Sequence, residues 1–287
     1  MLEQSQIKEK TMNAKEQKQI QNAWDNIAAG FDEFVTPFNT DLAEKALRLA
    51  GLQSDMRFLD VAAGSGALSI PAARLGTQVL ATDISPAMVE RLRARADEEG
   101  LSNLETRVMD GHTLELEEAS FDISGSQHGV SLFPDMPRGL RELVRVTKPE
   151  GKVLIVAVGP LTEVEFLGFF IGAMQATVPG FTGLPMDPPP LPFQVANPEE
   201  LRQQMADAGL SEIRVERANW KMEFQSGKHM WDFVTNSNPI GAGLVADLAE
   251  EQRTAVQQAL EGKLRQRSRN NGPAILNNPV NIGIGTK

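Results

Sequence analysis

The stretch 58–69 constrains the fold of this chain more than any other. Residues 58–61 are mostly apolar and predict a short buried strand, and a helical pattern runs over 68–75. Between them lie small residues with two glycines, Gly64 and Gly66. Such a tight turn before a helix start lets a ligand approach bare backbone and unpaired N–H groups. In open α/β sheets, ligands bind at this carboxyl edge of the strands.

Two ligand classes use this geometry. A dinucleotide fold expects G-x-G-x-x-G, but Ser69 stands at the third glycine position. Asp60, at the strand end, would repel a pyrophosphate and attract an ammonium group. The sequence therefore disfavours an NAD-dependent oxidoreductase, while a strand, turn and helix without any ligand stays the structural alternative.

The pattern Asp60-x-Ala62-x-Gly64-x-Gly66 resembles motif I of the class I S-adenosylmethionine (SAM)-dependent methyltransferases. That family usually has Gly at the position of Ala62. The resemblance implies that SAM is the cofactor, with S-adenosylhomocysteine as product, and that these four residues bind its methionine part. Asp60 would hold the ammonium group.

A second acid, Asp83, ends the next predicted strand, 78–83. It follows Asp60 by about the 20 residues expected for a carboxylate that binds a ribose hydroxyl pair. The segment Asp83-Ile84-Ser85-x-x-Met88 resembles the family's D-x-S-x-x-M. The resemblance implies that Asp83 binds the ribose hydroxyls, and that Ile84 and Met88 line the adenine region.

The third and fourth predicted strands end in further candidate residues. Strand 104–109 leads into Asp110 and Gly111. The resemblance implies that Asp110 accepts a hydrogen bond from the adenine amino group and that Gly111 leaves room for the ring. A strand starting at 121 runs on to Ser126, a cofactor-binding candidate, and to His128. His128 would face the methyl group, either as a general base or as a wall residue that contacts the substrate.

The N-terminal part predicts two helices, 14–29, ended by Gly30, and 41–50. The pattern Trp24…Ala28-x-x-Phe31-Asp32 resembles the W…A-x-x-Y-D segment of the ubiquinone/menaquinone-type methyltransferases, which lies over the SAM pocket. The resemblance implies that Trp24 and Phe31 help bind the substrate. Ordinary core packing is the alternative for both rings.

The regular alternation stops after the fifth strand, 152–158. Residues 161–178 are rich in apolar side chains, and 179–192 form a loop rich in Pro and Gly. We interpret this insertion as a lid over the acceptor; a core segment or a dimer interface is the alternative. The candidate substrate-binding residues in it are Phe166, Phe169 and Phe170.

Composition excludes several functions. The chain has 287 residues, 41% of them hydrophobic, and a formal net charge of −10, which argues against nucleic-acid binding. It has no Cys, which excludes disulfides and thiolate metal sites, and we expect no metal. No stretch approaches a membrane span, and the polar stretch 1–21 lacks the apolar region of a signal peptide. A cytoplasmic protein, possibly a homodimer, is the expectation.

These patterns predict a Rossmann-like, doubly wound α/β fold with a mostly parallel seven-stranded sheet. The expected parts are an N-terminal helical cap (1–50), a SAM-binding core (51–160), the lid insertion (161–197) and a C-terminal part that completes the sheet (198–287). The expected function is methyl transfer to oxygen, nitrogen or carbon of a small, largely apolar acceptor. A SAM-binding regulator without catalysis and an NAD-dependent oxidoreductase are the alternatives.

Overall fold

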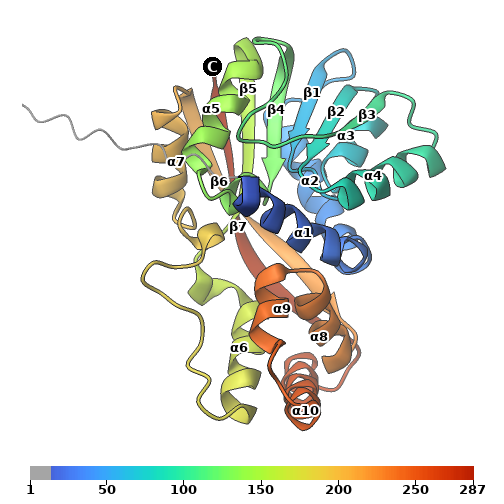
Figure 1. Cartoon of the computed structure of the whole chain (residues 1–287), viewed down its shortest axis with the longest axis vertical. Helices are drawn as coiled ribbons and strands as arrows, with labels where there is room; N and C mark the ends of the chain where they lie inside the picture. Colours follow the sequence, from blue (N-terminus) through green and yellow to red (C-terminus); the bar gives the residue numbers. More distant parts are fainter. Residues whose placement is uncertain (1–13) are drawn as a thin grey trace, which may run out of the picture.

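One seven-stranded sheet organises the molecule, in the order β3-β2-β1-β4-β5-β7-β6 (Figure 1). The computed structural model describes residues 14–287, so the first part of the predicted cap lies outside the described residues. The first five strands are parallel, and β7 is antiparallel to both its neighbours. The predicted Rossmann-like fold is therefore confirmed. The strands are β1 (Arg57–Val61), β2 (Gln78–Asp83), β3 (Leu104–Val108), β4 (Phe121–Gln127), β5 (Thr147–Val158), β6 (Ser211–Phe224) and β7 (Ala274–Thr286).

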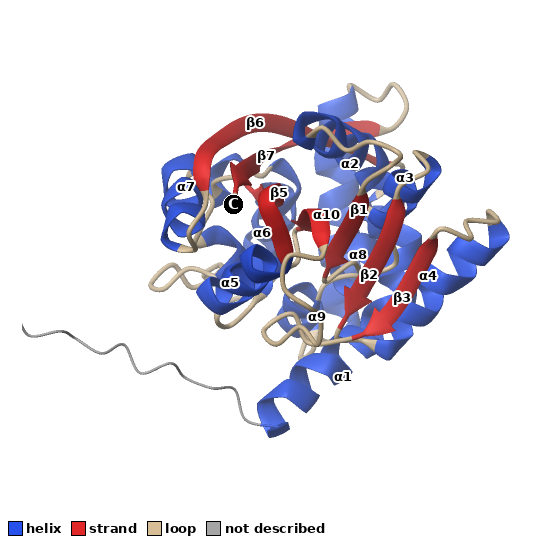
Figure 2. Ribbon diagram, turned by 90° about the horizontal axis from the view of Figure 1, so that it is seen from above, coloured by secondary structure: helices blue, strands red, loops and turns tan. Residues whose placement is uncertain are grey.

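Helices cover both faces of the sheet (Figure 2). Successive strand residues point to opposite faces, so Phe58 packs in one core cluster and Leu59 in the other. The first face carries α2 (Thr36–Ala50), α3 (Ser69–Arg74) and α4 (Pro86–Glu98), and the second carries α5 (Met136–Val146) and α7 (Pro198–Asp207). Short 3₁₀ turns lie at Val130–Leu132, Leu161–Glu163 and Leu191–Phe193.

The first α-helix ends at Gly30, as the sequence predicts, but the chain stays helical beyond this residue. Helix α1 (Ala14–Gly30) leads through a π-helical turn, Phe31–Val35, directly into α2. Gly30 keeps a right-handed helical conformation, with φ −68° and ψ −35°. A methyl group at Gly30 would lie 2.1 Å from the carbonyl oxygen of Asn236, so this glycine allows close packing.

Strands β6 and β7 extend beyond the rest of the sheet as a two-stranded ribbon. The pairing of β5 with β7 stops at Val158 and Val280, whereas β6 and β7 remain paired as far as Phe224 and Ala274. The ribbon leads into α8 (Gly227–Asn236), α9 (Pro239–Val245) and α10 (Glu250–Ser268). With α6 (Glu165–Thr177) these helices form a helical lobe below the sheet (Figure 1).

The insertion after β5 differs from a free lid. The side chains of Phe170, Ala173 and Met174 on α6 are fully buried, in the same core cluster as residues of α8 and α10. Residues 161–178 therefore join the helical lobe, and only the Pro-rich segment that follows is a long loop. No helix among residues 14–287 is long and apolar enough to cross a membrane.

Candidate active site

A first cavity, of about 100 Å³, lies at the carboxyl edge of the parallel strands. We call it the edge cavity. It brings together residues that the sequence places far apart, from the ends of β2 and β4, from the segments that follow β1 and β3, and from α1 above them. The predicted residues that line it are Trp24, Phe31, Ala62, Gly64, Asp83, Ile84, Met88, Asp110, Gly111 and His128.

The turn after β1 places its backbone against this cavity. Ala62 has φ 55° and Gly64 has φ 56°, both in the left-handed region that favours glycine. A methyl group added at Gly64 would lie 3.0 Å from the ring carbon Cε1 of Phe31, so the glycine leaves space under that ring. The turn therefore lines the cavity with a glycine that leaves space at its wall.

Asp83 is the acid at the end of β2, and its side chain is held from two sides. Its carboxylate accepts hydrogen bonds from the backbone N–H of Gly64 and of Ser85, each 2.9 Å long. Burial raises the pKa of Asp83 to about 6, although these hydrogen bonds act in the opposite direction. The carboxylate lines the edge cavity with lone pairs that remain available to a ligand.

Asp60 does not line the edge cavity. Its side chain is 1% exposed and accepts a hydrogen bond from the hydroxyl of Ser69 at the start of α3. Burial raises the pKa of Asp60 to about 7, and the nearby Asp83 adds to the rise. Ser69 stands where a dinucleotide-binding turn would have its third glycine, and its hydroxyl is the hydrogen-bond partner of Asp60.

Gly66 and Ser126 also lie behind the lining. A methyl group at Gly66 would come within 2.2 Å of Leu92 Cδ1, so this glycine lets α4 approach the turn. The hydroxyl of Ser126 donates to the carbonyl of Val61 (2.7 Å) and accepts from the N–H of Val130 (2.9 Å). Both residues support the walls of the cavity and do not face it.

Asp110 lines the edge cavity beyond β3. One carboxylate oxygen accepts hydrogen bonds from the N–H (2.9 Å) and the Nδ1 (2.8 Å) of His112, and the other accepts from Gln17 Nε2 (2.9 Å). Burial alone would raise the pKa of Asp110, but the hydrogen bonds from His112 outweigh it and leave this pKa below its ordinary value.

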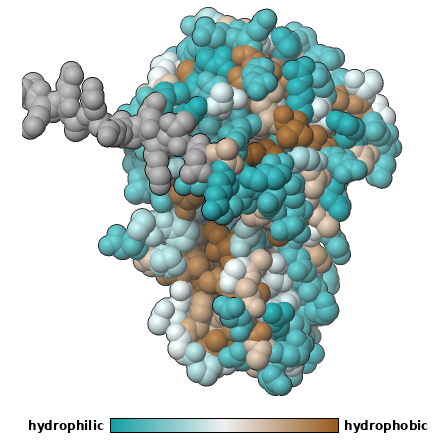
Figure 3. All heavy atoms as spheres, in the orientation of Figure 1, coloured by the Kyte–Doolittle hydropathy of each residue, from teal (hydrophilic) through white to brown (hydrophobic). Residues whose placement is uncertain are grey.

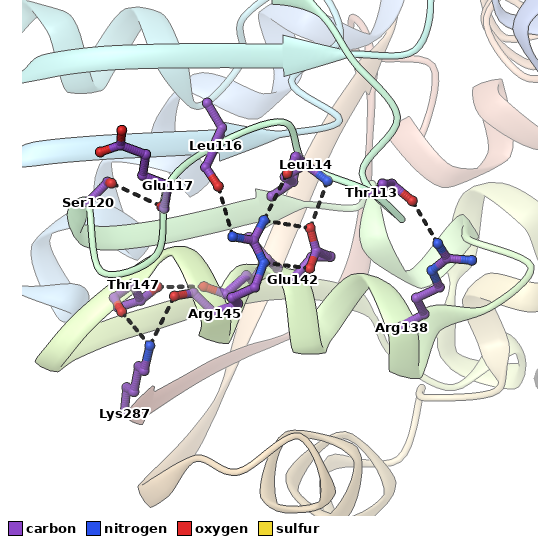
Figure 4. A network of polar contacts seen from close by, with 11 residues as sticks. Thr113, Leu114, Leu116, Glu117, Ser120, Arg138, Glu142, Arg145, Thr147 and Lys287 are labelled. Atoms are coloured by element: carbon purple, nitrogen blue, oxygen red, sulfur yellow. Dashed lines mark hydrogen bonds and ion pairs between the residues drawn. The ribbon is translucent and has the colours of Figure 1, made fainter.

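The segment that follows Asp110 is fastened to α5. The guanidinium of Arg145 donates to the carbonyls of Leu114 and Leu116 and pairs with Glu142, while Glu142 also accepts from the N–H of Leu114 (Figure 4). The ammonium of Lys287 binds the carbonyl of Arg145 from the other side. This network fixes the connection between β3 and β4, and with it one rim of the edge cavity.

Helix α1 forms the roof of the edge cavity. Asp25 on α1 accepts a hydrogen bond from the hydroxyl of Ser85, at the start of α4. The rings of Trp24 and Phe31 meet edge to face, with centroids 6.2 Å apart. These contacts, together with the hydrogen bond from Gln17 to Asp110, hold α1 against the sheet edge. Trp24 and Phe31, the two ring residues singled out in the sequence, both line the cavity.

A second cavity, of about 130 Å³, lies between the sheet edge and the helical lobe. We call it the apolar cavity, and none of its lining side chains is charged. Phe166 and Phe170 line it, whereas the third predicted phenylalanine, Phe169, does not. The Pro-rich segment closes part of it through Pro190 and Phe193. Apolar residues reach the surface in the same region, between the two parts of the molecule (Figure 3).

The two cavities share one wall, made of Trp24, Phe31, His128 and Leu132. His128 has φ 62° and its N–H donates to the carbonyl of Val156 (2.7 Å), so the backbone turns sharply at the end of β4. Both ring nitrogens are buried without a partner among the described residues. Burial lowers the pKa of His128 to about 4, so its imidazole is neutral at pH 7.

Some lining residues were given no specific role from the sequence, although Gln127 belongs to the strand end that was expected to face the methyl group. Trp220 on β6 stacks on His128, with ring centroids 4.8 Å apart and an interplanar angle of 27°. Gln127 lines the edge cavity and donates to Asn39 Oδ1 (2.7 Å). Trp220 lies in a long strand with no recognisable motif, so no local signal marks it. Gln127 stands next to His128 at the strand end, which was a usable signal.

Comparisons with known proteins agree with this geometry. Residues 59–155 match the family described as a methyltransferase domain. Among curated proteins, the chain is 39% identical over 108 residues to an uncharacterised protein of Mycobacterium tuberculosis, covering 38% of this chain and 39% of that protein. It is 30% identical over 139 residues to the aklanonic acid methyltransferase DauC of a Streptomyces species, covering 47% and 63%. It is 31% identical over 155 residues to the nocamycin O-methyltransferase of Saccharothrix syringae, covering 53% and 55%. In each case the match spans less than two thirds of the relative's length.

Solved structures share the fold. A crystal structure from Bacillus halodurans, described as a putative methyltransferase, superimposes with a TM-score of 0.54 at 16% identity, covering 85% of this chain and 98% of that one. At this identity the likeness concerns the fold alone.

Proposed function

We infer that this chain, which has the domain of a class I SAM-dependent methyltransferase, transfers a methyl group from SAM to a small, largely apolar acceptor. The observation that carries the proposal is the wall shared by the edge cavity and the apolar cavity. Four residues border both cavities, so a cofactor in the first and an acceptor in the second would lie next to each other there. The resemblance to the ubiquinone/menaquinone-type group is part of the proposal.

The chemistry of the edge cavity suits SAM. Of the residues that the structure describes, its lining contains the carboxylates of Asp83 and Asp110 and no Lys or Arg. Such a lining favours a ligand with positive charge, as SAM has, and disfavours the pyrophosphate of NAD. We propose that Asp83 binds the ribose hydroxyls, that Asp110 accepts from the adenine amino group, and that the backbone from Ala62 to Gly64 lies along the methionine part.

The residues that do not line the cavity have a supporting role in this proposal. Asp60 would act on the ligand through its field and through the turn that it braces with Ser69, because its carboxylate is enclosed. Gly66 and Ser126 would keep α4 and β4 in place. Ile84, Met88 and Gly111 would form the wall beside the adenine.

When bound, SAM supplies a methyl group on a positively charged sulfur. Transfer would form a bond from the acceptor to that methyl carbon and break the bond from the carbon to sulfur, with the bonding pair staying on sulfur. The protein contributes position and the exclusion of water. His128 would contact the acceptor as a neutral imidazole. With a pKa near 4 it is a weak proton acceptor at pH 7, so the proton on the methylated oxygen would be lost to bulk solvent outside the cavity.

The relatives support a small-molecule acceptor. Two of them are named for aklanonic acid and for nocamycin, and the second is named as an O-methyltransferase. We propose oxygen as the accepting atom on that basis. Phe166 and Phe170 would bind the acceptor's apolar body, because both line the apolar cavity. A cytoplasmic location and a homodimer stay predictions.

Calorimetric titration with SAM, S-adenosylhomocysteine and NAD tests the cofactor. We expect both sulfur compounds to bind and NAD not to bind. Methyl transfer from labelled SAM to matched phenols, amines and carboxylic acids then tests the reaction. Binding of S-adenosylhomocysteine with no transfer to any class would instead indicate a SAM-binding protein without catalysis. Binding of NAD alone would overturn the assignment.

A further inference from the structure

His128 is the polar group of the apolar cavity that lacks a partner. Among residues 14–287, it is the one side chain lining this cavity whose buried polar atoms make no hydrogen bond. Other polar groups in the lining are engaged: the hydroxyl of Ser131 donates to the carbonyl of His128, and Asn238 Oδ1 accepts from the N–H of Ile240. An unpaired buried donor and acceptor are unfavourable, so they favour a ligand that can pair with them.

The imidazole is held in one plane by Trp220. The indole stacks on it, with ring centroids 4.8 Å apart. Trp220 is itself held by one hydrogen bond from its side chain and one to its backbone. Its Nε1 donates to the carbonyl of Phe38 (2.9 Å), and its backbone carbonyl accepts from Asn278 Nδ2 (3.1 Å). Trp220 is 6% exposed and belongs to the ribbon of β6 and β7. The stack leaves the edges of the imidazole, with both nitrogens, as the parts that can meet a ligand.

The remaining lining excludes an ionised acceptor. Among residues 14–287 it contains no Asp, Glu, Lys or Arg, so a charge placed in this cavity would lose its hydration without gaining a counter-charge from them. A neutral imidazole offers one donor and one acceptor, which suits a hydroxyl group. Aromatic side chains from α1, α6 and β6 supply flat apolar surface around it.

We propose that the acceptor is an uncharged ring compound whose hydroxyl group hydrogen-bonds the imidazole of His128, and that Trp220 is the positioning residue that holds this imidazole. This inference rests on the proposed function and narrows its substrate class. In this arrangement His128 binds the polar hydroxyl group of the acceptor, and the other lining residues contact its apolar ring.

The test uses 2-naphthol, naphthalene and 2-naphthoate as probes that share one ring system. The protein is saturated with S-adenosylhomocysteine, and the ring nitrogens of its three histidines are followed by ¹H–¹⁵N NMR. We expect 2-naphthol to bind and to shift the His128 nitrogens, naphthalene to bind on the order of tenfold more weakly without that shift, and 2-naphthoate not to bind. Equal affinity for 2-naphthol and 2-naphthoate, or no binding of 2-naphthol at its solubility limit, would overturn the inference.

Variants at two positions separate positioning from packing. Trp220→Phe keeps a stacking ring and should retain the 2-naphthol response, whereas Trp220→Leu should lose the His128 shift and the preference for 2-naphthol over naphthalene. His128→Phe keeps a ring on Trp220 without its nitrogens and should lose the same preference, which decides the matter if Trp220→Leu does not fold. An unchanged preference in His128→Phe would overturn the inference.

Binding of S-adenosylhomocysteine, measured in the same samples, distinguishes failure of this inference from failure of the proposed function. If it binds normally while 2-naphthol leaves His128 unaffected, the inference fails and the proposed function stands. If it does not bind to the unaltered protein, the proposed function fails, and this inference with it.

Discussion

The carboxylate of Asp83 accepts a 2.9 Å hydrogen bond from the N–H of Gly64, so the end of β2 fixes the turn that follows β1. One acid therefore shapes the backbone and lines the edge cavity at once. This hydrogen bond joins the glycine turn after β1 to the acid at the end of β2, two motifs that are 19 residues apart in the sequence.

We expect Asp83→Ala to weaken the binding of S-adenosylhomocysteine strongly. The proposed ribose contacts are charge-assisted hydrogen bonds, each worth about 1.5–3 kcal/mol, and the turn at Gly64 loses its anchor as well. Calorimetric titration measures the change. Asp97→Ala, at an exposed position on α4, is the matched control and should bind normally. Unaltered affinity in Asp83→Ala would remove Asp83 from the cofactor site.

The buried Asp60 predicts a specific dependence of stability on pH. Its pKa rises from 3.8 to about 7 on folding, so the folded state favours the protonated form. Protonated Asp60 therefore stabilises the folded state relative to the unfolded state. This contribution is fully present below pH 3.8 and is lost as the pH rises towards 7. Asp60→Asn has no such titration. Its stability relative to the unaltered protein should therefore increase over this window, by up to about 4 kcal/mol.

Denaturant unfolding at a series of pH values measures this difference. Comparing the two proteins cancels the contribution of carboxylates whose pKa is lowered, such as Asp122 and Glu142, because both proteins contain them. If the free energies of unfolding of the two proteins run parallel from about pH 4 to about pH 8, the pKa of Asp60 is not raised by folding.

Phe193 and Phe169 form a matched pair for the apolar cavity. Both are half-buried, but only Phe193 lines the cavity. We expect Phe193→Ala to raise the KM for a hydroxylated ring acceptor on the order of tenfold, because it removes apolar contact area. Phe169→Ala should change this KM little, and binding of S-adenosylhomocysteine should survive in both. Equal effects of the two variants on the acceptor KM would argue that the cavity is not the acceptor site.

Gly66 and Gly100 distinguish a steric clash from backbone strain. Both have positive φ, 98° and 67°, so alanine is strained at either position. A methyl group at Gly66 meets Leu92 within 2.2 Å, whereas at Gly100 it meets nothing within 4 Å. Gly66→Ala should therefore destabilise the protein more than Gly100→Ala, by about 1–3 kcal/mol in denaturant unfolding. Equal losses would mean that Leu92 moves aside without cost.

Much of the fold was predictable because local signals coincide with it. The glycine turn after β1, the acids at the ends of β2 and β3, and Ser85 as the cap of α4 lie in sequence patterns that the structure retains; Ser85 accepts from the N–H of Met88. Helix capping and strand ends depend on neighbouring residues, so a single sequence contains their signals.

The unpredicted features depend on contacts between distant residues. The chain stays helical beyond Gly30, and the lack of a side chain at this residue serves the contact with Asn236. Asp60 turns towards Ser69, away from the edge cavity. The stack of Trp220 on His128 joins β6 to the end of β4. No local pattern states which distant surface a residue will meet.

The ribbon of β6 and β7 makes α8, α9 and α10 one closed insertion in the chain. Residues 225–273 are inserted between two strands that pair with each other along their whole length, so the ribbon closes the insertion at its base. The helices of that insertion can change in length and sequence without altering the register of β7 on β5. Under the proposed function, we expect changes in these helices to alter the lining of the apolar cavity and to leave the lining of the edge cavity unchanged.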